Sequence, residues 1–150
     1  MRKIILYSFL VFLYLTKLSF GTIINKIDIN GNTRITNESV IVFGDINLNA
    51  DINEKELDSI LKRLYETNFF KDVNLSIINN TLIINLVENP IIQNVSILGI
   101  PSKTLREKIN DVIVLKSASS FVEFYAKQDF RKIKSFLKTQ GYYFVDVKSS

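Results

Sequence analysis

The feature that most constrains the fold is a short helix-to-strand joint that occurs twice in the sequence. The first copy, LKRLYETNFFKDVNL (residues 61–75), contains a helix end, a pair of aromatic residues and a strand start, and IKSFLKTQGYYFVDV (residues 133–147) has the same order. Each copy follows an alternating segment that ends in glycine, IINKIDING (residues 23–31) and IIQNVSILG (residues 91–99). This agreement in order and spacing indicates a repeated module of about 70 residues, present once whole and once shortened.

The first half of this module predicts one strand and two helices. Residues 23–30 alternate between apolar and polar side chains, which is typical of a half-buried strand. Thr36 can cap a short helix that stops at Gly44, because its hydroxyl can accept a hydrogen bond from a free N–H group at the helix start. A longer helix follows, with Asn53 as its N-cap and Glu56 at the capping-box position. Apolar residues recur along this helix with helical spacing, so one side of it should be buried.

The second half of the module predicts a hairpin. Asn68 follows the long helix and is placed to take the left-handed conformation that ends many helices. Two alternating segments, residues 73–77 and 82–86, are joined through Asn79-Asn80, a pair that accepts the positive φ angles of a tight turn. The order is therefore strand, helix, helix, strand, strand. This order predicts an α+β fold with both helices on the apolar face of a three-stranded sheet, because neither layer can bury its apolar side alone.

Glu88-Asn89-Pro90 marks the boundary between the two modules, since proline cannot donate to a β-ladder and biases the preceding residue to extended geometry. We assign residues 22–89 to the first module and residues 90–150 to the second. The second module follows the same order of elements but is truncated before its last strand. Its two remaining strands, residues 91–98 and 143–149, are therefore expected not to form a proper shared ladder.

The first 21 residues are typical of a secretory signal peptide. They combine a basic start, an apolar run over residues 4–15, and small residues at Ser19 and Gly21, the two positions that a signal peptidase reads. We predict cleavage after Gly21, so that residues 1–21 are removed. An uncleaved membrane anchor is the alternative, but it would have to accommodate Lys17 within a run that is short for a bilayer.

Composition argues against catalysis and against nucleic-acid binding. The chain has no Cys and no His, which removes thiol nucleophiles, imidazole bases and most zinc or haem sites. The carboxylates of Asp28, Asp72, Glu88 and Asp146 fall on separate loops and faces of the predicted fold, and no glycine-rich phosphate loop is present. Three of the four units of net positive charge lie in the first 20 residues, so the rest is nearly neutral and matches phosphate backbones poorly. We expect no enzyme activity, no catalytic or metal-binding residues, no cofactors and no nucleic-acid partner.

Three motifs give the chain a resemblance to a known family. They are IxIxGNxRI, LYxTxxFxDVxL and TLIINLVExPxIxxVxIxG, and the last spans the boundary between the modules. Together they resemble the first and second POTRA modules of outer-membrane protein assembly factors of the Omp85 family. Two positions depart from the family pattern: Asn68 stands where the family usually has Gly, and Ile100-Pro101 where it often has Asn. No further POTRA module or barrel follows, so the chain resembles the N-terminal fragment of a longer protein.

The resemblance implies tandem POTRA modules, each with a three-stranded mixed sheet covered by two helices on one face, the third strand central and the second at an edge. It implies the periplasmic part of an outer-membrane β-barrel assembly factor, located at the periplasmic face of the outer membrane. Membrane contact would come through a C-terminal barrel absent from this chain. The implied partners are unfolded outer-membrane proteins and accessory assembly lipoproteins.

The resemblance also places a client-binding edge strand in the first module. Its free N–H and C=O groups would pair with an extended client, a mode called β-augmentation. The predicted edge strand consists of Val73, Asn74, Leu75, Ser76, Ile77 and Ile78.

Three alternatives remain open at this point. The predicted edge strand could be purely structural, with a solvated border shielded by Asn74 and Ser76. The chain could instead be the POTRA region of a two-partner secretion transporter, which also carries two such modules before a barrel. It could also be an anchored cell-division protein of the FtsQ type, although Lys17, the cleavage signal and the second module favour the assembly factor.

Overall fold

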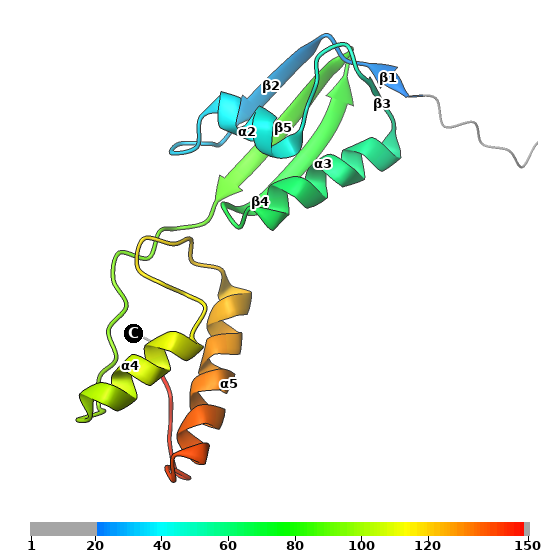
Figure 1. Cartoon of the computed structure of the whole chain (residues 1–150). Coiled ribbons are helices and arrows are strands. Elements are labelled where there is room, and N and C mark those ends of the chain that lie inside the picture. Colours follow the sequence, from blue (N-terminus) through cyan, green and yellow to red (C-terminus); the bar gives the residue numbers. More distant parts are fainter. Residues whose placement is uncertain (1–20, 149–150) are drawn as a thin grey trace, which may run out of the picture.

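A computed structural model describes residues 21–148 of the chain. Within this range the chain forms two lobes with separate hydrophobic cores, which we call the sheet lobe (residues 22–89) and the helical lobe (residues 90–148) (Figure 1). The predicted signal peptide covers residues 1–21, and all of it except its last residue, Gly21, lies outside the described part of the chain. None of the helices between residues 21 and 148 has both the length and the apolar character needed to span a bilayer.

The sheet lobe is built on a three-stranded mixed sheet with the strand order β2, β5, β4. β2 (Lys26–Asn30) runs parallel to β5 (Thr81–Glu88), and β4 (Phe70–Ile78) runs antiparallel to β5. β5 is therefore central and β4 lies at an edge, as the resemblance implies. α2 (Asn37–Gly44) and α3 (Glu54–Glu66) cover one face of this sheet, which confirms the predicted α+β arrangement (Figure 1).

Side-chain caps fix where the two helices of the sheet lobe begin. Thr36 Oγ1 accepts a hydrogen bond from the Ser39 N–H group at the start of α2, and Asn53 Oδ1 accepts one from the Glu56 N–H group at the start of α3. Both predicted N-caps are confirmed. The Glu56 carboxylate does not complete the capping box with Asn53. Its Oε1 atom instead forms an ion pair with Arg63 Nη2 at 2.8 Å.

Residues with positive φ fix where the elements end. Asn68 has a φ angle of 61° after α3, as predicted for this position. Asn79 and Asn80 have φ angles of 48° and 60°, which confirms the tight hairpin turn between β4 and β5. At the end of α2 the left-handed residue is Asp45, with a φ angle of 50°, whereas Gly44 is still helical.

The strand predicted over residues 23–30 is divided in two. Its beginning forms β1 (Thr22–Ile23), which pairs antiparallel with β3 (Asp51–Ile52) in a small separate sheet. Asn25 donates its N–H group to the carbonyl of the β4–β5 turn at 2.9 Å, and β2 begins at the next residue. The prediction missed this break because Ile24 is fully buried and keeps the hydrophobic pattern continuous across the change of partner.

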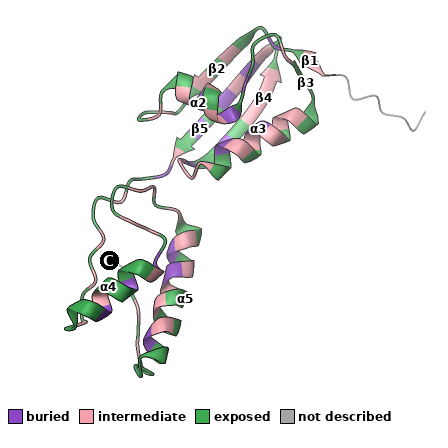
Figure 2. Cartoon of the chain, viewed as in Figure 1, coloured by how far each residue is buried: buried purple, intermediate pink, exposed green. Residues whose placement is uncertain are grey.

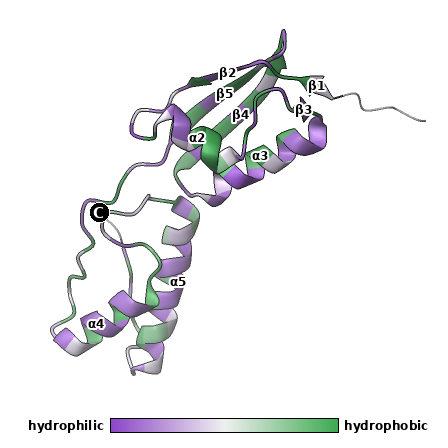
Figure 3. Ribbon diagram, turned by 45° about the horizontal axis from the view of Figure 1, so that its top comes forward, coloured by the Kyte–Doolittle hydropathy of each residue, from purple (hydrophilic) through white to green (hydrophobic). Residues whose placement is uncertain are grey.

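The core of the sheet lobe lies between the sheet and its two helices. β5 contributes Leu82, Ile84 and Leu86, and α3 contributes Ile60 and Leu64, all with at most 4% of their surface exposed. Burying one such side chain stabilises a protein by roughly 1.5–3 kcal/mol. Hydrophobic stretches colour parts of β4 and β5 green, whereas α3 shows a mixture of hydrophilic and hydrophobic residues (Figure 3).

The helical lobe consists of α4 (Lys103–Val112) and α5 (Glu123–Thr139) packed against each other. Ser102 caps α4 by accepting a hydrogen bond from the Leu105 N–H group. The buried residues of both helices are visible in Figure 2, and this second core is smaller than the first. Its buried members are Leu105, Ile109, Ile113 and Leu137.

The strands predicted in the helical lobe are not formed. Residues 91–98 and 143–148 contain no strand, and the only β-pairing found between residues 90 and 148 is an isolated bridge from Ile91 to Ser120. Val95 and Val145 still pack on the core, so the apolar pattern was interpreted correctly even though the backbone pairing was not. The two segments have no central strand between them in the described chain, and a strand needs such a partner. The expectation that they share no proper ladder agrees with this arrangement.

Candidate strand-binding edge

The sheet has two borders, and they differ in length and composition. β4 has nine residues and, within residues 21–148, is hydrogen-bonded as a strand to β5 alone. β2 has five residues and exposes Lys26 and Asp28 on one face. Charged residues on a short border strand discourage pairing with another chain. β4 carries its two charged residues, Lys71 and Asp72, at its start and has none over residues 73–78, so this stretch is the better candidate for strand addition.

The hairpin turn determines which backbone groups of β4 face the open side. Ile78 and Thr81 flank the turn directly and form its closing, hydrogen-bonded pair. Hydrogen-bonded and non-hydrogen-bonded pairs alternate along an antiparallel ladder. The N–H and C=O groups of Leu75 and Ile77 therefore point away from β5 and are available to an added strand.

The next outward N–H group, that of Val73, is already occupied. It lies 3.1 Å from the Tyr65 hydroxyl oxygen and 3.1 Å from Asp72 Oδ1, and the Tyr65 hydroxyl donates to the same Asp72 oxygen at 3.2 Å. Tyr65 belongs to the last turn of α3, and Asp72 follows a β-bulge at the start of β4. The sequence analysis gave the Tyr65 hydroxyl no role.

The side chains of β4 flank the open backbone groups without covering them. Val73, Leu75 and Ile77 pack on the core under the helices, and Asn74 and Ser76 alternate with them on the other face. Side chains stand roughly perpendicular to a sheet, whereas the outward N–H and C=O groups lie in its plane. The side chains of Asn74 and Ser76 therefore flank the border strand but do not block the N–H and C=O groups that an added strand would use.

A carboxylate clasp holds the loop after β2 against the end of β5. Glu88 Oε1 accepts hydrogen bonds from the N–H groups of Thr33, Arg34 and Ile35 at 2.8, 2.9 and 3.0 Å, and Arg34 Nε lies 2.8 Å from Glu88 Oε2. Burial raises the pKa of Glu88, but the three backbone N–H groups and Arg34 outweigh it and lower the pKa from 4.5 to about 2. The clasp explains physically why the GNxRI and ExP motifs occur together.

The clasp extends to the residue that leaves the sheet lobe. Arg34 Nη2 donates to the Asn89 carbonyl oxygen at 2.6 Å, and the Asn89 N–H group donates to the Phe69 carbonyl at 2.8 Å. Asn89 Nδ2 donates to the Asn68 carbonyl at 2.9 Å, so this buried polar side chain is hydrogen-bonded as burial requires. The boundary residue is thus fixed on both its backbone and its side chain.

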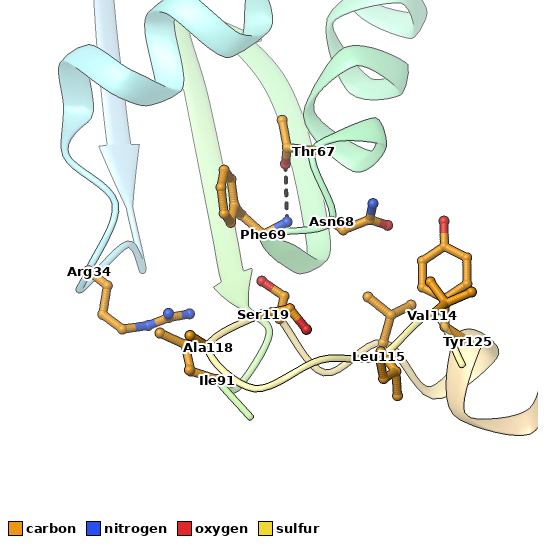
Figure 4. A pocket seen from close by; sticks show the side chains of 12 residues that line it. Arg34, Thr67, Asn68, Phe69, Ile91, Val114, Leu115, Ala118, Ser119 and Tyr125 are labelled. Atoms are coloured by element: carbon orange, nitrogen blue, oxygen red, sulfur yellow. Dashed lines mark hydrogen bonds between the residues drawn. The ribbon is translucent and has the colours of Figure 1, made fainter. Parts of the chain in front are cut away.

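A cavity of about 300 Å³ lies below the end of β5, next to the linker (Figure 4). Arg34 is the only charged residue in its lining, and that guanidinium is already paired with Glu88. Among the described residues, neither a carboxylate nor a lysine lines this cavity. The residues that line it are Arg34, Thr67, Asn68, Phe69, Ile91, Val114, Leu115, Ala118, Ser119, Ser120, Val122 and Tyr125.

The four carboxylates considered as catalytic candidates lie on different elements. Asp28 is on β2, Asp72 is at the start of β4, and Glu88 is held in the clasp. Asp146 is on the segment after α5 and pairs with Lys148 at 3.0 Å. Among residues 21–148 the structure shows no group of three or more acidic side chains arranged to hold a metal ion.

Comparison with curated sequences identifies relatives of one kind. No protein-family model matches the chain. The chain is 28% identical over 127 residues to the outer membrane protein assembly factor BamA of Neorickettsia risticii, a match that covers 84% of this chain. It is 25% identical over 103 residues, or 67% of this chain, to the protein of the same name from Buchnera aphidicola. Both matches span 17% of the relative, so the chain corresponds to a small part of these proteins.

Comparison with solved structures identifies the fold. The N-terminal domain of Omp85 from Thermosynechococcus elongatus superposes with a TM-score of 0.55 and 18% identity, covering 81% of this chain and 53% of that one. POTRA modules 1 and 2 of the periplasmic domain of Omp85 from Anabaena superpose with a TM-score of 0.55 and 11% identity, covering 88% of both chains. The chain therefore has the fold of tandem POTRA modules of the Omp85 type, and its sequence is similar to that of the assembly factor BamA.

Proposed function

We propose that this chain is the periplasmic part of an outer-membrane β-barrel assembly factor, with residues 22–89 as its first POTRA module and residues 90–150 as an incomplete second one. We propose that it is exported through the signal peptide at residues 1–21. The similarity to BamA over most of the chain supports this proposal, and it favours the assembly factor over a secretion transporter or a cell-division protein.

The proposed activity is the binding of unfolded outer-membrane proteins by β-augmentation at β4. The observation that supports it is the open border with outward backbone groups at Leu75 and Ile77. An added strand could form four hydrogen bonds there, each with a net value of about 0.5–1.5 kcal/mol. The four bonds total about 2–6 kcal/mol before the cost of association is subtracted, so a single edge would bind no more tightly than about millimolar. Weak binding suits a protein that must release each client.

Backbone pairing also explains how one edge could serve many clients. Every extended polypeptide presents the same N–H and C=O groups, so the border strand would recognise an extended backbone more than a particular sequence. Repeated modules in a longer protein would raise the overall affinity through effective concentration. Scaffolding of accessory lipoproteins and membrane contact through a C-terminal barrel belong to the same proposal and rest on the family resemblance alone.

A titration followed by NMR tests the binding proposal. The probe is a synthetic peptide with the alternating apolar pattern of a transmembrane β-strand, added to the ¹⁵N-labelled chain. We expect the amide signals of Leu75 and Ile77 to shift, with saturation in the millimolar range. The control is the same peptide N-methylated at every residue, which removes the N–H donors from both of its borders. Equal shifts with both peptides, or shifts confined to β2, would exclude β-augmentation at β4.

A further inference from the structure

The start of β4 is built differently from the rest of the strand. The register with β5 shifts between Phe70 and Asp72, so Lys71 forms a bulge. Val73 lies two residues after Lys71, and its outward N–H group is shared between the Tyr65 hydroxyl and Asp72 Oδ1. From Leu75 onward, no hydrogen bond to the outward groups of β4 is found among the described residues.

The three groups form a closed set. The Tyr65 hydroxyl accepts from the Val73 N–H group and donates to Asp72, and the Asp72 carboxylate accepts from both. Both donors, the Val73 N–H group and the Tyr65 hydroxyl, therefore have acceptors among these three groups. A tyrosine can bridge in this way because its hydroxyl is both donor and acceptor, whereas a phenylalanine of the same shape cannot.

The position of Tyr65 on α3 makes this contact possible. Its neighbour Leu64 is fully buried under the sheet, whereas Tyr65 is 39% exposed and therefore lies at the margin of the helix-covered face. From this margin the ring reaches the border of β4 and places its hydroxyl at the backbone. The ring itself then occupies space beside the strand that an added chain would otherwise fill.

We infer that Tyr65 and Asp72 act as an edge stop, which ends strand addition before Val73 and so restricts a client to Leu75 and Ile77. This inference rests on the proposed function of β4. An added strand that ran past Leu75 would have to displace the tyrosine hydroxyl and leave the Asp72 carboxylate with fewer donors. It would exchange one hydrogen bond to the Val73 N–H group for another, so the added strand gains nothing by continuing. The edge stop thereby fixes the register and length of pairing. The backbone of a client cannot fix them, because it presents the same N–H and C=O groups at every position.

Hydrogen exchange tests the edge stop without any client. In the full chain, the Val73 amide is expected to exchange more slowly than the amides of Leu75 and Ile77. The variant Tyr65→Phe combined with Asp72→Ala removes both acceptors, and it should accelerate exchange at Val73 by about 2- to 10-fold, the value of one net hydrogen bond. The control is Tyr125→Phe on α5, which should leave the exchange at Val73 unchanged. Unchanged exchange at Val73 in the double variant would overturn the inference.

The peptide titration then separates the edge stop from the binding proposal. With the original chain, peptide-induced shifts should include Leu75 and Ile77 but not Val73. With the double variant they should extend to Val73, and the peptide should bind about 2- to 10-fold more tightly through the added bond. Shifts at Val73 as large as those at Leu75 in the original chain would overturn the edge stop while leaving β-augmentation in place. Absence of shifts along all of β4 in both proteins would overturn the proposed function, and the edge stop with it.

Discussion

The clasp between Glu88 and the loop after β2 should be a major contributor to the stability of the sheet lobe, and Glu88→Gln tests this directly. The substitution keeps the shape of the side chain but removes its charge. It replaces one of two acceptor oxygens with a donor, which would face either Arg34 or the N–H groups of the loop. Three short backbone hydrogen bonds and one ion pair are weakened together.

The size of the effect follows from the pKa of Glu88. A pKa lowered from 4.5 to about 2 means that the folded state favours the charged form, and each pKa unit corresponds to about 1.4 kcal/mol. The Glu88 side chain is 7% exposed, but its partner Arg34 is 36% exposed and partly screened by solvent, so the ion pair is discounted. We expect Glu88→Gln to lower the free energy of unfolding by about 2–3 kcal/mol at pH 7.

The sign of the pH dependence is also fixed. Because the pKa of Glu88 is lower in the folded state, its contribution is fully present above pH 4.5 and is lost as the pH falls towards 2. The difference between the original chain and Glu88→Gln should therefore shrink to about 1 kcal/mol at pH 3.

Urea unfolding followed by circular dichroism at pH 7 and pH 3 measures this difference. The control variant is Glu66→Gln, whose carboxylate is 63% exposed and lies 3.8 Å from Lys62, and which should change stability by no more than about 0.5 kcal/mol. A Glu88→Gln variant as stable as the control at pH 7 would refute the reasoning. A difference that did not change between the two pH values would refute it as well.

Three further predictions concern other parts of the chain. Gly31→Ala should lower the free energy of unfolding by about 1–3 kcal/mol in thermal unfolding, because Gly31 has a φ angle of 86° and an added Cβ would lie 2.0 Å from the Leu86 carbonyl oxygen. Gly99→Ala is the control and should lower it less, because Gly99 has a φ angle of 79° but an added Cβ there would have nothing within 4 Å. Asp129→Asn should destabilise the helical lobe by about 1–3 kcal/mol, because the buried carboxylate accepts hydrogen bonds from the Val114 and Leu115 N–H groups at 2.8 and 2.9 Å. Hydrogen exchange should accelerate in the α4–α5 loop and stay unchanged in the sheet lobe. The intact mass of the exported protein should correspond to a chain that begins at Thr22, and a mass that retains the first 21 residues would support the anchor instead.

The local patterns of the sheet lobe were predictable because each depends on near neighbours in the sequence. Asn79-Asn80 indicates a tight turn without knowledge of the rest of the fold, and the alternation over residues 82–86 indicates a strand with one buried face. The N-caps at Thr36 and Asn53 follow from the same local chemistry. These features agree with one another, and this agreement made the module recognisable.

The features that sequence reasoning missed depend on residues far apart in the chain. Glu88 contacts N–H groups more than 50 positions earlier, and only the joint presence of the GNxRI and ExP motifs could have indicated it. The role of the Tyr65 hydroxyl depends on the distance between α3 and β4, which no periodicity encodes. In the helical lobe the alternation at Val95 predicted burial correctly, but a strand also needs a neighbour, and a pattern of side chains does not supply one.

The fixation of Asn89 has a consequence for how such modules are joined in series. The residue that begins the linker is hydrogen-bonded to Arg34, Phe69 and Asn68, and these bonds reach both the loop after β2 and the joint between α3 and β4. The direction in which the polypeptide departs is therefore set by the finished lobe and is undefined until that lobe has folded. A substitution that disturbs the interior of one module would therefore change the position of the next module, even though no side chain of that next module has changed.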